Sequence, residues 1–434
     1  MKTAALGMQH VLAMYAGAIL VPLIVGGALG LTTEQLTYLV AIDIFMCGVA
    51  TILQISSNRF FGIGLPVVLG CTFTAVGPMI AIGGEFGISA IYGAIIVSGI
   101  FVILISTVFG KLVRFFPPVV TGSVVTIIGL TLIPVAINDL AGGQGASDFG
   151  SSINLLLGFG TLTFIILMYR FSKGFIRSIS IIIGLIAGTT VATVFGKVDF
   201  NAVMDASYFH MPQLLYFGRP TFEISAVITM CLVVMVSLVE STGVYFALSD
   251  ITDKELTKED LAKGYRAEGI AVLLGGIFNA FQYTAFSQNV GLVQLTGVTK
   301  RKVIFVAGMI LVVFGLIPKF AALTTVIPTS VLGGAMLAMF GMVVSQGIKM
   351  LGKVINESPE NSMIIACSVG MGLGVTVVPD LFSVLPTGIQ ILTNNGIVAG
   401  SVTAIALNII FNMRPFFSKR PSSQPDQQLT EQEV

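Results

Sequence analysis

Apolar stretches of about 20 residues, separated by short polar or charged segments, recur along the whole chain. A transmembrane helix needs about 20 mainly apolar residues, so each stretch predicts a membrane span. The pattern gives seven segments in each half, with a more polar stretch between the halves at 197–221. The predicted segments lie near 5–29, 36–56, 62–82, 87–110, 117–138, 152–170, 177–196, 222–249, 262–281, 284–298, 302–317, 319–347, 361–377 and 384–412. We therefore expect an all-α polytopic membrane protein with 14 transmembrane segments.

The basic residues predict how these segments are oriented. Lys and Arg concentrate in cytoplasmic loops. Of the 22 Lys and Arg residues, all but Lys197, Arg219 and Lys319 fall on one side of the predicted bundle, which puts both termini in the cytoplasm. Because each half has an odd number of segments, the second half enters the membrane from the opposite side. Two halves that share a fold would then form a 7+7 inverted repeat, a frequent plan of secondary transporters.

Two of the predicted segments are too interrupted by Gly and Pro to form continuous helices. They are the third of each half, segments 3 and 10, around residues 64–78 and 279–291. Each predicts a short extended piece followed by a half-helix. Lipid does not tolerate unpaired strand edges, so the two extended pieces should lie against each other inside the protein. The half-helix N-termini would then offer backbone N–H groups to a ligand at mid-membrane, as matching broken helices do in transporters.

The composition supports this class and excludes others. The chain is 55% hydrophobic and 10% charged, with a mean hydropathy of +0.96, whereas soluble domains have about 25% charged residues. A net charge of +1 gives no basic patch for nucleic acid, and no His-Glu-x-x-His or paired-aspartate motif indicates an enzyme. The cysteines lie in apolar segments and are interpreted as small hydrophobes: Cys47, Cys71, Cys231 and Cys367. We expect no catalytic activity, no cofactor, no metal and no removable signal peptide.

Glu240 and Gln288 are the most informative polar residues inside the predicted spans. A carboxylate at membrane depth is costly and therefore indicates function. When ionised, Glu240 accepts hydrogen bonds from ligand N–H groups, and when protonated it can carry a coupling proton. Gln288 offers both a donor and an acceptor. The alternatives are a structural glutamate paired with a buried hydroxyl and an amide that links two helices.

The run Gln288-Asn289-x-Gly291-x4-Thr296-Gly297 resembles the signature of the nucleobase/ascorbate transporter family, the nucleobase:cation symporters. Four further stretches fit the family pattern: Gln9-His10, Gly70-Cys71-Thr72-Phe73, Glu240-Ser241-Thr242-Gly243 and Ala267-Glu268-Gly269. The resemblance extends to about Met413 and is strongest to bacterial xanthine and uric acid permeases. Two positions depart from it. Glu268 stands where several purine transporters carry aspartate, and Gly297 stands where others carry arginine.

The resemblance implies a secondary active transporter that imports a purine by proton symport with alternating access. Xanthine is the expected substrate, with uric acid as the alternative. It also implies a homodimer in the bacterial cell membrane, in contact with lipid. Each chain would have a core domain of residues 1–115 and 222–318 and a gate domain of residues 116–221 and 319–413. Residues 414–434 would form a cytoplasmic tail.

By the same resemblance, Glu240 is the main substrate anchor. The other expected substrate-binding residues are Gln288, Phe73, Phe286, Ser287, Asn289 and Thr72. Phe73 and Phe286 would stack on the two faces of the purine, although composition alone favours ordinary packing for any phenylalanine. Asn289 has a second interpretation, in which it orients the extended pieces.

A proton is the expected coupling ion. No sodium cage is evident, whereas Glu268, Glu240 and His10 form a protonatable set of the kind that relays protons in transporters. Glu268 is alternatively a shallow interfacial charge, and His10 either tunes Glu240 or hydrogen-bonds a neighbouring helix. Asp43 is expected to be structural.

Two rival classes of transport protein remain. A nucleobase channel would line its path with repeated polar rings, which the sequence does not contain. An anion exchanger on the same seven-plus-seven plan would be poorly served by an acidic residue at its binding site.

Overall fold

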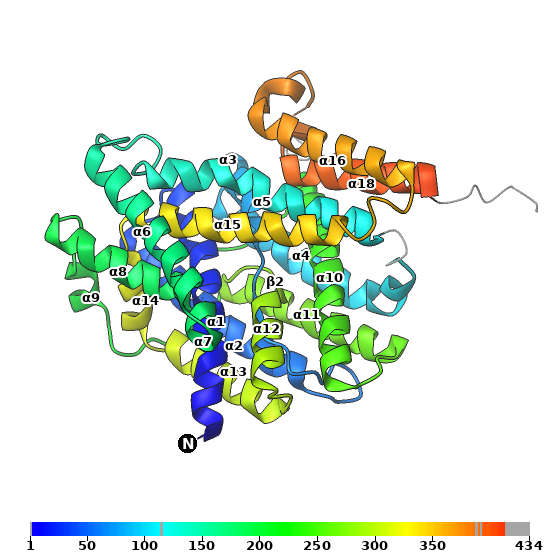
Figure 1. Cartoon of the computed structure of the whole chain (residues 1–434), viewed down its shortest axis with the longest axis horizontal. Helices are drawn as coiled ribbons and strands as arrows, with labels where there is room; N and C mark the ends of the chain where they lie inside the picture. Colours follow the sequence, from blue (N-terminus) through cyan, green and yellow to red (C-terminus); the bar gives the residue numbers. More distant parts are fainter. Residues whose placement is uncertain (1, 113–115, 387–388, 391–392, 413–434) are drawn as a thin grey trace, which may run out of the picture.

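The protein is a bundle of helices built around one very short two-stranded sheet (Figure 1). The computed structural model describes residues 2–112, 116–386, 389–390 and 393–412. The helices before the middle of the chain are α1 (Lys2–Ala28), α2 (Thr33–Ile55), η1 (Phe73–Ala75), α3 (Val76–Phe86), α4 (Ile88–Leu112), α5 (Pro118–Leu140), α6 (Ser152–Phe171), α7 (Gly174–Ser178), α8 (Ser180–Val194) and α9 (Asn201–Asp205). Those after it are α10 (Ile224–Thr252), α11 (Lys258–Phe278), α12 (Ser287–Thr296), α13 (Arg301–Gly315), α14 (Pro318–Thr325), α15 (Thr329–Leu351), α16 (Pro359–Val377), η3 (Pro379–Phe382) and α18 (Gly396–Asn412). The strands are β1 (Leu69–Cys71) and β2 (Tyr283–Ala285).

The helices confirm a polytopic membrane protein. Among the described residues, 8 helices are long and apolar enough to span a membrane, or 9 if the bent pair α13 and α14 counts as one span. The other predicted segments are short apolar helices, broken segments, or, in α11, a helix whose first turns carry charged residues. The strictly apolar spans are therefore fewer than the 14 predicted segments.

Two predicted segments have different bounds in the structure. The segment predicted at 319–347 is two helices, α14 and α15, separated just before Pro328. Proline has no N–H and disfavours helical backbone in the residue before it. In the segment predicted at 384–412, helix α18 begins at Gly396. There the side-chain oxygen of Asn395 accepts the N–H groups of Ile397 and Val398 at 3.1 Å and caps α18.

The two extended pieces pair with each other, as predicted. β1 and β2 are antiparallel, with Gly70 opposite Thr284 at the centre of the register. The pairing continues beyond both strands, because Thr72 N–H donates to the Gln282 carbonyl at 3.0 Å and Phe286 N–H donates to the Val68 carbonyl at 3.0 Å. All six strand residues are buried. Each broken segment thus satisfies the backbone of the other, and we call this pair the strand crossing.

A half-helix follows each strand. After β1 the chain turns through η1 into α3, and after β2 it enters α12 directly. The Thr72 side chain caps η1 by accepting the N–H of Thr74 at 3.2 Å, whereas no side chain caps α12. The first N–H groups of α12 therefore lack a side-chain partner, which makes this helix end the better anion or carbonyl site.

The long helices pack in two groups. One contains α1, α2, α4, α10, α11 and α13, and the other contains α5, α6, α8, α15, α16 and α18. The half-helices α3 and α12 pack with the first group, and so does α14, which contacts α2 although it falls in the segment predicted for the gate domain. In the second group α5 and α15 lie side by side over most of their length (Figure 1).

Glycines allow α5 and α15 to approach closely, as small residues do between membrane helices. A Cβ atom at Gly333 would lie 2.0 Å from the backbone nitrogen of Leu140, and one at Gly129 would lie 2.8 Å from the backbone nitrogen of Val344. These obstacles are backbone atoms that cannot rotate away. The two helices must separate if either glycine gains a side chain.

We expect Gly333→Ala to lower the thermal stability of the purified protein in detergent by about 1–3 kcal/mol, the usual cost of overpacking. Gly341→Ala is the matched control on the same helix, because a Cβ there meets no atom within 4 Å and alanine favours helix by up to about 1 kcal/mol. Equal melting temperatures for the two variants would contradict the close α5–α15 contact.

Candidate substrate-binding site

Helix α10 is tied to both broken segments through two serines one turn apart. The Ser241 hydroxyl accepts the N–H of Ala285 at 3.0 Å and shares a hydrogen bond with the Thr284 hydroxyl at 3.1 Å, which fixes α10 to β2. The Ser237 hydroxyl donates to the Thr72 hydroxyl at 3.4 Å, at the end of β1. The middle of α10, which carries Glu240, is therefore held at the strand crossing.

Glu240 is the open polar group of this region. Its side chain is only partly buried, in a helix whose neighbouring positions Val239 and Ser241 are buried. In the described part of the chain no donor and no cation pairs with its carboxylate. A carboxylate inside a membrane protein is stable only if something pairs with it. The hydrogen-bonding capacity of Glu240 is therefore unused among the described residues, and the alternative of a glutamate already paired with a buried hydroxyl is not what the structure contains.

One face of α12 is exposed and polar. It carries Ser287, Gln288, Gly291 and Gln294, which follow the spacing of a single helical stripe. Because α10 packs against α12, this stripe begins beside the helix that carries Glu240. The Gln288 amide makes no hydrogen bond among the described residues, so it does not link two helices. It is free to bind a ligand.

Asn289 faces the opposite way and is buried. Its side-chain nitrogen donates to the carbonyl oxygen of His10 at 3.1 Å and lies 3.1 Å from the ring nitrogen Nδ1 of the same residue. This pair joins α12 to α1, so Asn289 orients the half-helix. His10 correspondingly contacts a neighbouring helix, and the structure gives it no hydrogen bond to Glu240.

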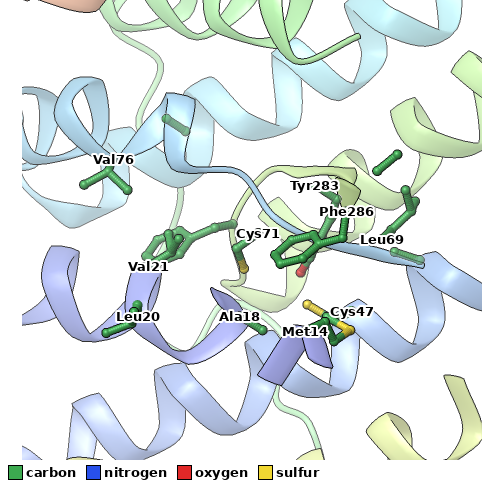
Figure 2. Packing of buried hydrophobic residues seen from close by; sticks show 14 of the residues in the cluster. Met14, Ala18, Leu20, Val21, Cys47, Leu69, Cys71, Val76, Tyr283 and Phe286 are labelled. Carbon is green, nitrogen blue, oxygen red and sulfur yellow. The ribbon is translucent and has the colours of Figure 1, made fainter. Parts of the chain in front are cut away.

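Phe286 has no open ring face in this structure. A Cβ atom at Gly17 of α1 would lie 2.7 Å from its ring, and one at Gly70 of β1 would lie 2.3 Å from it. The ring is therefore packed against both glycines, and Figure 2 shows it among the buried side chains of Met14, Cys47 and Cys71. The expected stacking of Phe286 on a ligand is not available without a change of its rotamer, because protein atoms occupy both sides.

Phe73 packs in a different place from Phe286. Its ring is partly buried and meets Phe340 of α15 edge-on, with ring centroids 5.6 Å apart. Phe73 thus lies where the two helix groups meet. The elements that carry Thr72, Phe73, Glu240, Ser287 and Gln288 contact one another around the strand crossing and the start of α12, and Phe286 is buried in the packing beside them.

Glu268 of α11 is enclosed by protein, with 1% of its surface exposed, so it is not a shallow interfacial charge. The Tyr245 hydroxyl of α10 donates to its Oε1 atom, and the side-chain nitrogen of Gln54 of α2 donates to the Tyr245 hydroxyl. Its Oε2 atom has no partner among the described residues. This buried chain joins α2, α10 and α11.

Sequence reasoning did not assign roles to Ser237, Thr284, Tyr245 or Gln54. One signal was present: Ser237, Ser241 and Tyr245 are spaced by four residues and so form a single hydroxyl stripe on α10. The partners of that stripe lie far away in the sequence and carry no local pattern. Asp43 of α2, expected to be structural, accepts hydrogen bonds from both broken segments.

Comparison with known proteins gives the family. The model of a permease family, whose members include xanthine and uric acid permeases, matches residues 1–381. The chain belongs to the nucleobase/ascorbate transporter family. This permease is 66% identical to the xanthine permease of Bacillus subtilis over 100% of this chain and 98% of that protein. It is 65% identical to the uric acid permease PucK of the same species, with 96% of each covered, and 42% identical to the uric acid transporter UacT of Escherichia coli, with 95% and 86% covered.

The family resemblance predicted from the motifs is thereby confirmed, and the chain is a membrane permease and not an enzyme. Two solved structures share its fold. The transmembrane domain of the cyanobacterial bicarbonate transporter BicA superposes with a TM-score of 0.64 at 18% identity, covering 89% of this chain and 97% of that one. Murine Slc26a9, an anion transporter in the inward-facing state, gives 0.62 at 11% identity, covering 94% and 69%.

We expect Ser241→Ala to destabilise this permease by about 1–3 kcal/mol, because the buried Ala285 N–H loses its acceptor. Ser225→Ala is the matched control near the start of α10, since its hydroxyl makes no hydrogen bond in the described structure. Thermal unfolding of both variants in detergent is the measurement. A Ser241 variant as stable as the Ser225 variant would mean that α10 is not held to β2 by this contact.

Proposed function

We propose that this permease imports a purine by proton symport with alternating access, with xanthine as the first candidate and uric acid as the alternative. The names of its relatives support a purine. Xanthine permease and uric acid permease PucK are 66% and 65% identical to it. Because these values are nearly equal, overall similarity does not choose between the two substrates.

The observation that carries the proposal is the unpaired Glu240 carboxylate at the strand crossing. Xanthine carries ring N–H donors beside carbonyl acceptors. An ionised carboxylate accepts two such N–H groups, and the free Gln288 amide complements it with a donor and an acceptor. Charge-assisted hydrogen bonds of this kind are the strong ones. Together these two side chains match the polar edge of a purine.

Neighbouring groups complete the proposed site. The uncapped start of α12 at Ser287 offers backbone N–H groups to a purine carbonyl. Thr72 and Phe73 border the site from the other broken segment, with Phe73 as the stacking surface. Asn289 and Phe286 support this site by holding α12 and the strand crossing, and a ligand-stacking role for Phe286 would require its ring to leave the contacts with Gly17 and Gly70.

Alternating access is supported by the two packing groups. The group that contains α10, α11 and α13 carries the strand crossing, and the group around α5 and α15 packs against it through few elements. The first group serves as the core domain and the second as the gate domain, in the proposed ranges 1–115 with 222–318 and 116–221 with 319–413, except that α14 packs with the first group. Movement of one group against the other would expose the site to each side of the membrane in turn.

We propose the wider architecture by the same reasoning. The broken third segments of the two halves pair with each other, which favours a 14-segment chain built as a 7+7 inverted repeat. The distribution of Lys and Arg favours cytoplasmic termini in a bacterial cell membrane. A homodimer in contact with lipid follows from the family.

The proton route is proposed through Glu268 and Glu240. Glu268 is buried, has one free carboxylate oxygen and is linked through Tyr245 to α10, the helix of Glu240. It therefore serves as the relay, while Glu240 serves as the anchor. His10 holds Asn289 and contributes through the position of α12.

A nucleobase channel is the alternative class. Accumulation of labelled xanthine in cells against its gradient, abolished by a protonophore, supports the symporter, and equilibration that ignores the protonophore supports the channel. Competition of labelled xanthine uptake by unlabelled uric acid, hypoxanthine, guanine and uracil then ranks the substrates. Inhibition by uracil alone would contradict a purine site.

We expect Glu240→Gln to reduce uptake to background while the protein still reaches the membrane, because the amide keeps the shape but loses the anion. Loss of a charged hydrogen bond costs about 1.5–3 kcal/mol, or roughly ten- to a hundredfold in affinity. Glu223→Gln, on the exposed start of the same helix, should transport normally. Uptake by the Glu240 variant at the unmodified rate would refute the site.

We expect Glu268→Gln to bind purine but to lose accumulation against a gradient, because the relay can no longer release a proton. In membrane vesicles, uptake by the unmodified protein should rise as external pH falls and should not respond to sodium. Glu259→Gln, exposed on the first turn of α11, is the control. Sodium-dependent uptake, or an unchanged pH profile in the Glu268 variant, would exclude this proton route.

A further inference from the structure

Asp43, Cys47 and Cys71 form a buried cluster beside the strand crossing. Asp43 and Cys47 lie one turn apart on α2, and Cys71 ends β1. All three have no exposed surface, and one ligand atom from each lies within 4.8 Å of the other two. Figure 2 shows the two cysteines near each other in the core. Side chains from two separate elements, α2 and β1, thus lie close together.

The carboxylate of Asp43 is already oriented toward this point. Its Oδ1 atom accepts the N–H of Phe281 at 3.1 Å and the hydroxyl of Tyr283 at 3.4 Å. Its Oδ2 atom accepts the thiol of Cys71. The first oxygen is therefore held by the segment that leads into β2, and the second is directed at a sulfur. Such hydrogen bonds to the far oxygen are how proteins orient a metal-binding carboxylate.

Two thiolates and a carboxylate are a ligand set that suits Zn²⁺ and related thiophilic cations. With zinc–sulfur bonds of about 2.3 Å and zinc–oxygen bonds of about 2.1 Å, ligand atoms in a tetrahedral site stand roughly 3.6–3.8 Å apart. A pair of ligand atoms at the 4.8 Å limit would close by about 1 Å, and Cys71 Sγ and Asp43 Oδ2, which are already in hydrogen-bond contact, would move slightly apart. Side-chain rotation alone can supply a change of that size.

The net charge of the buried site also permits a divalent cation to replace the thiol protons. With Asp43 ionised and both cysteines protonated, the cluster carries a net charge of −1. A divalent cation bound to two thiolates and one carboxylate also gives −1, because the two thiol protons leave as the metal enters. The cation thus takes the place of the two thiol protons, so binding adds no net charge to the apolar core.

We propose that Asp43, Cys47 and Cys71 bind one thiophilic divalent cation of the Zn²⁺ class, which links α2 to β1 at the strand crossing. The remaining coordination position would be filled by the Tyr283 hydroxyl or by water. The bound cation fixes Cys71 between Gly70, which packs on Phe286, and Thr72, which caps η1. The site is separate from the transported ligand's proposed contacts, and its test does not depend on the transported substrate.

The test is a Co²⁺ titration of the full-length protein, purified in detergent, reduced and freed of metal by a chelator. Co²⁺ reports thiolate ligation by an intense near-ultraviolet band and tetrahedral geometry by visible bands. We expect one equivalent per chain, displaced by Zn²⁺. Because up to two protons are released, affinity should weaken as pH is lowered, by up to about a hundredfold per pH unit.

Variants locate the site. Cys47→Ser and Cys71→Ser should each weaken Co²⁺ binding at least tenfold and remove part of the thiolate band, and Asp43→Asn should weaken binding while the band persists. Cys231→Ser and Cys367→Ser, which lie outside the cluster, are matched controls that should bind as the unmodified protein does. Circular dichroism and elution volume establish that each variant is folded.

Any of three outcomes overturns the proposal. One is the absence of a thiolate band in the folded, reduced, unmodified protein, a measurement that needs no variant. A second is an unchanged band in a folded Cys47→Ser, Cys71→Ser double variant. Loss of Co²⁺ binding in the Cys231 or Cys367 variant would likewise assign the metal to a different place.

Discussion

The membrane interior offers no water to backbone groups, and the arrangement of this permease depends on that constraint. Breaking two helices inside a membrane protein frees N–H and C=O groups that lipid cannot satisfy. The chain solves this by pairing the two breaks, with Gly70 opposite Thr284 and the pairing extended to Thr72 and Phe286. Every other feature of the site follows from this crossing, because it sets where both half-helices begin.

Polar residues around the strand crossing are of two kinds. Some hold the crossing through hydrogen bonds within the protein, and others make no hydrogen bond among the described residues. Ser241 fixes α10 to β2, Asn289 fixes α12 to α1, and Asp43 contacts both broken segments. Their hydrogen bonds are internal, so they stiffen the crossing. Glu240 and Gln288 have no hydrogen-bond partner in the part of the chain that the structure describes, so their hydrogen-bonding capacity is available for the proposed ligand. Precise recognition of a flat, polar molecule requires polar side chains that are held rigidly in place.

The fold itself does not decide what is transported. The bicarbonate transporter BicA and the anion transporter murine Slc26a9 share it at 18% and 11% identity, so proteins with different named substrates have this scaffold. The difference lies in the side chains at the crossing. In this permease Glu240 places a carboxylate on the helix that contacts the crossing, and the relatives at 66% and 65% identity are named xanthine permease and uric acid permease.

The sequence by itself determined the membrane class, the two broken segments and the family, because apolar length, Gly/Pro interruptions and the Gln288–Gly297 motif are local signals. It also indicated Glu240, since a carboxylate in an apolar run is conspicuous. Only the tertiary structure decided that Asn289 binds His10, that Glu268 is enclosed and that Phe286 is packed between Gly17 and Gly70. These outcomes depend on partners up to 279 residues away, and no local pattern encodes which distant side chain fills a given space.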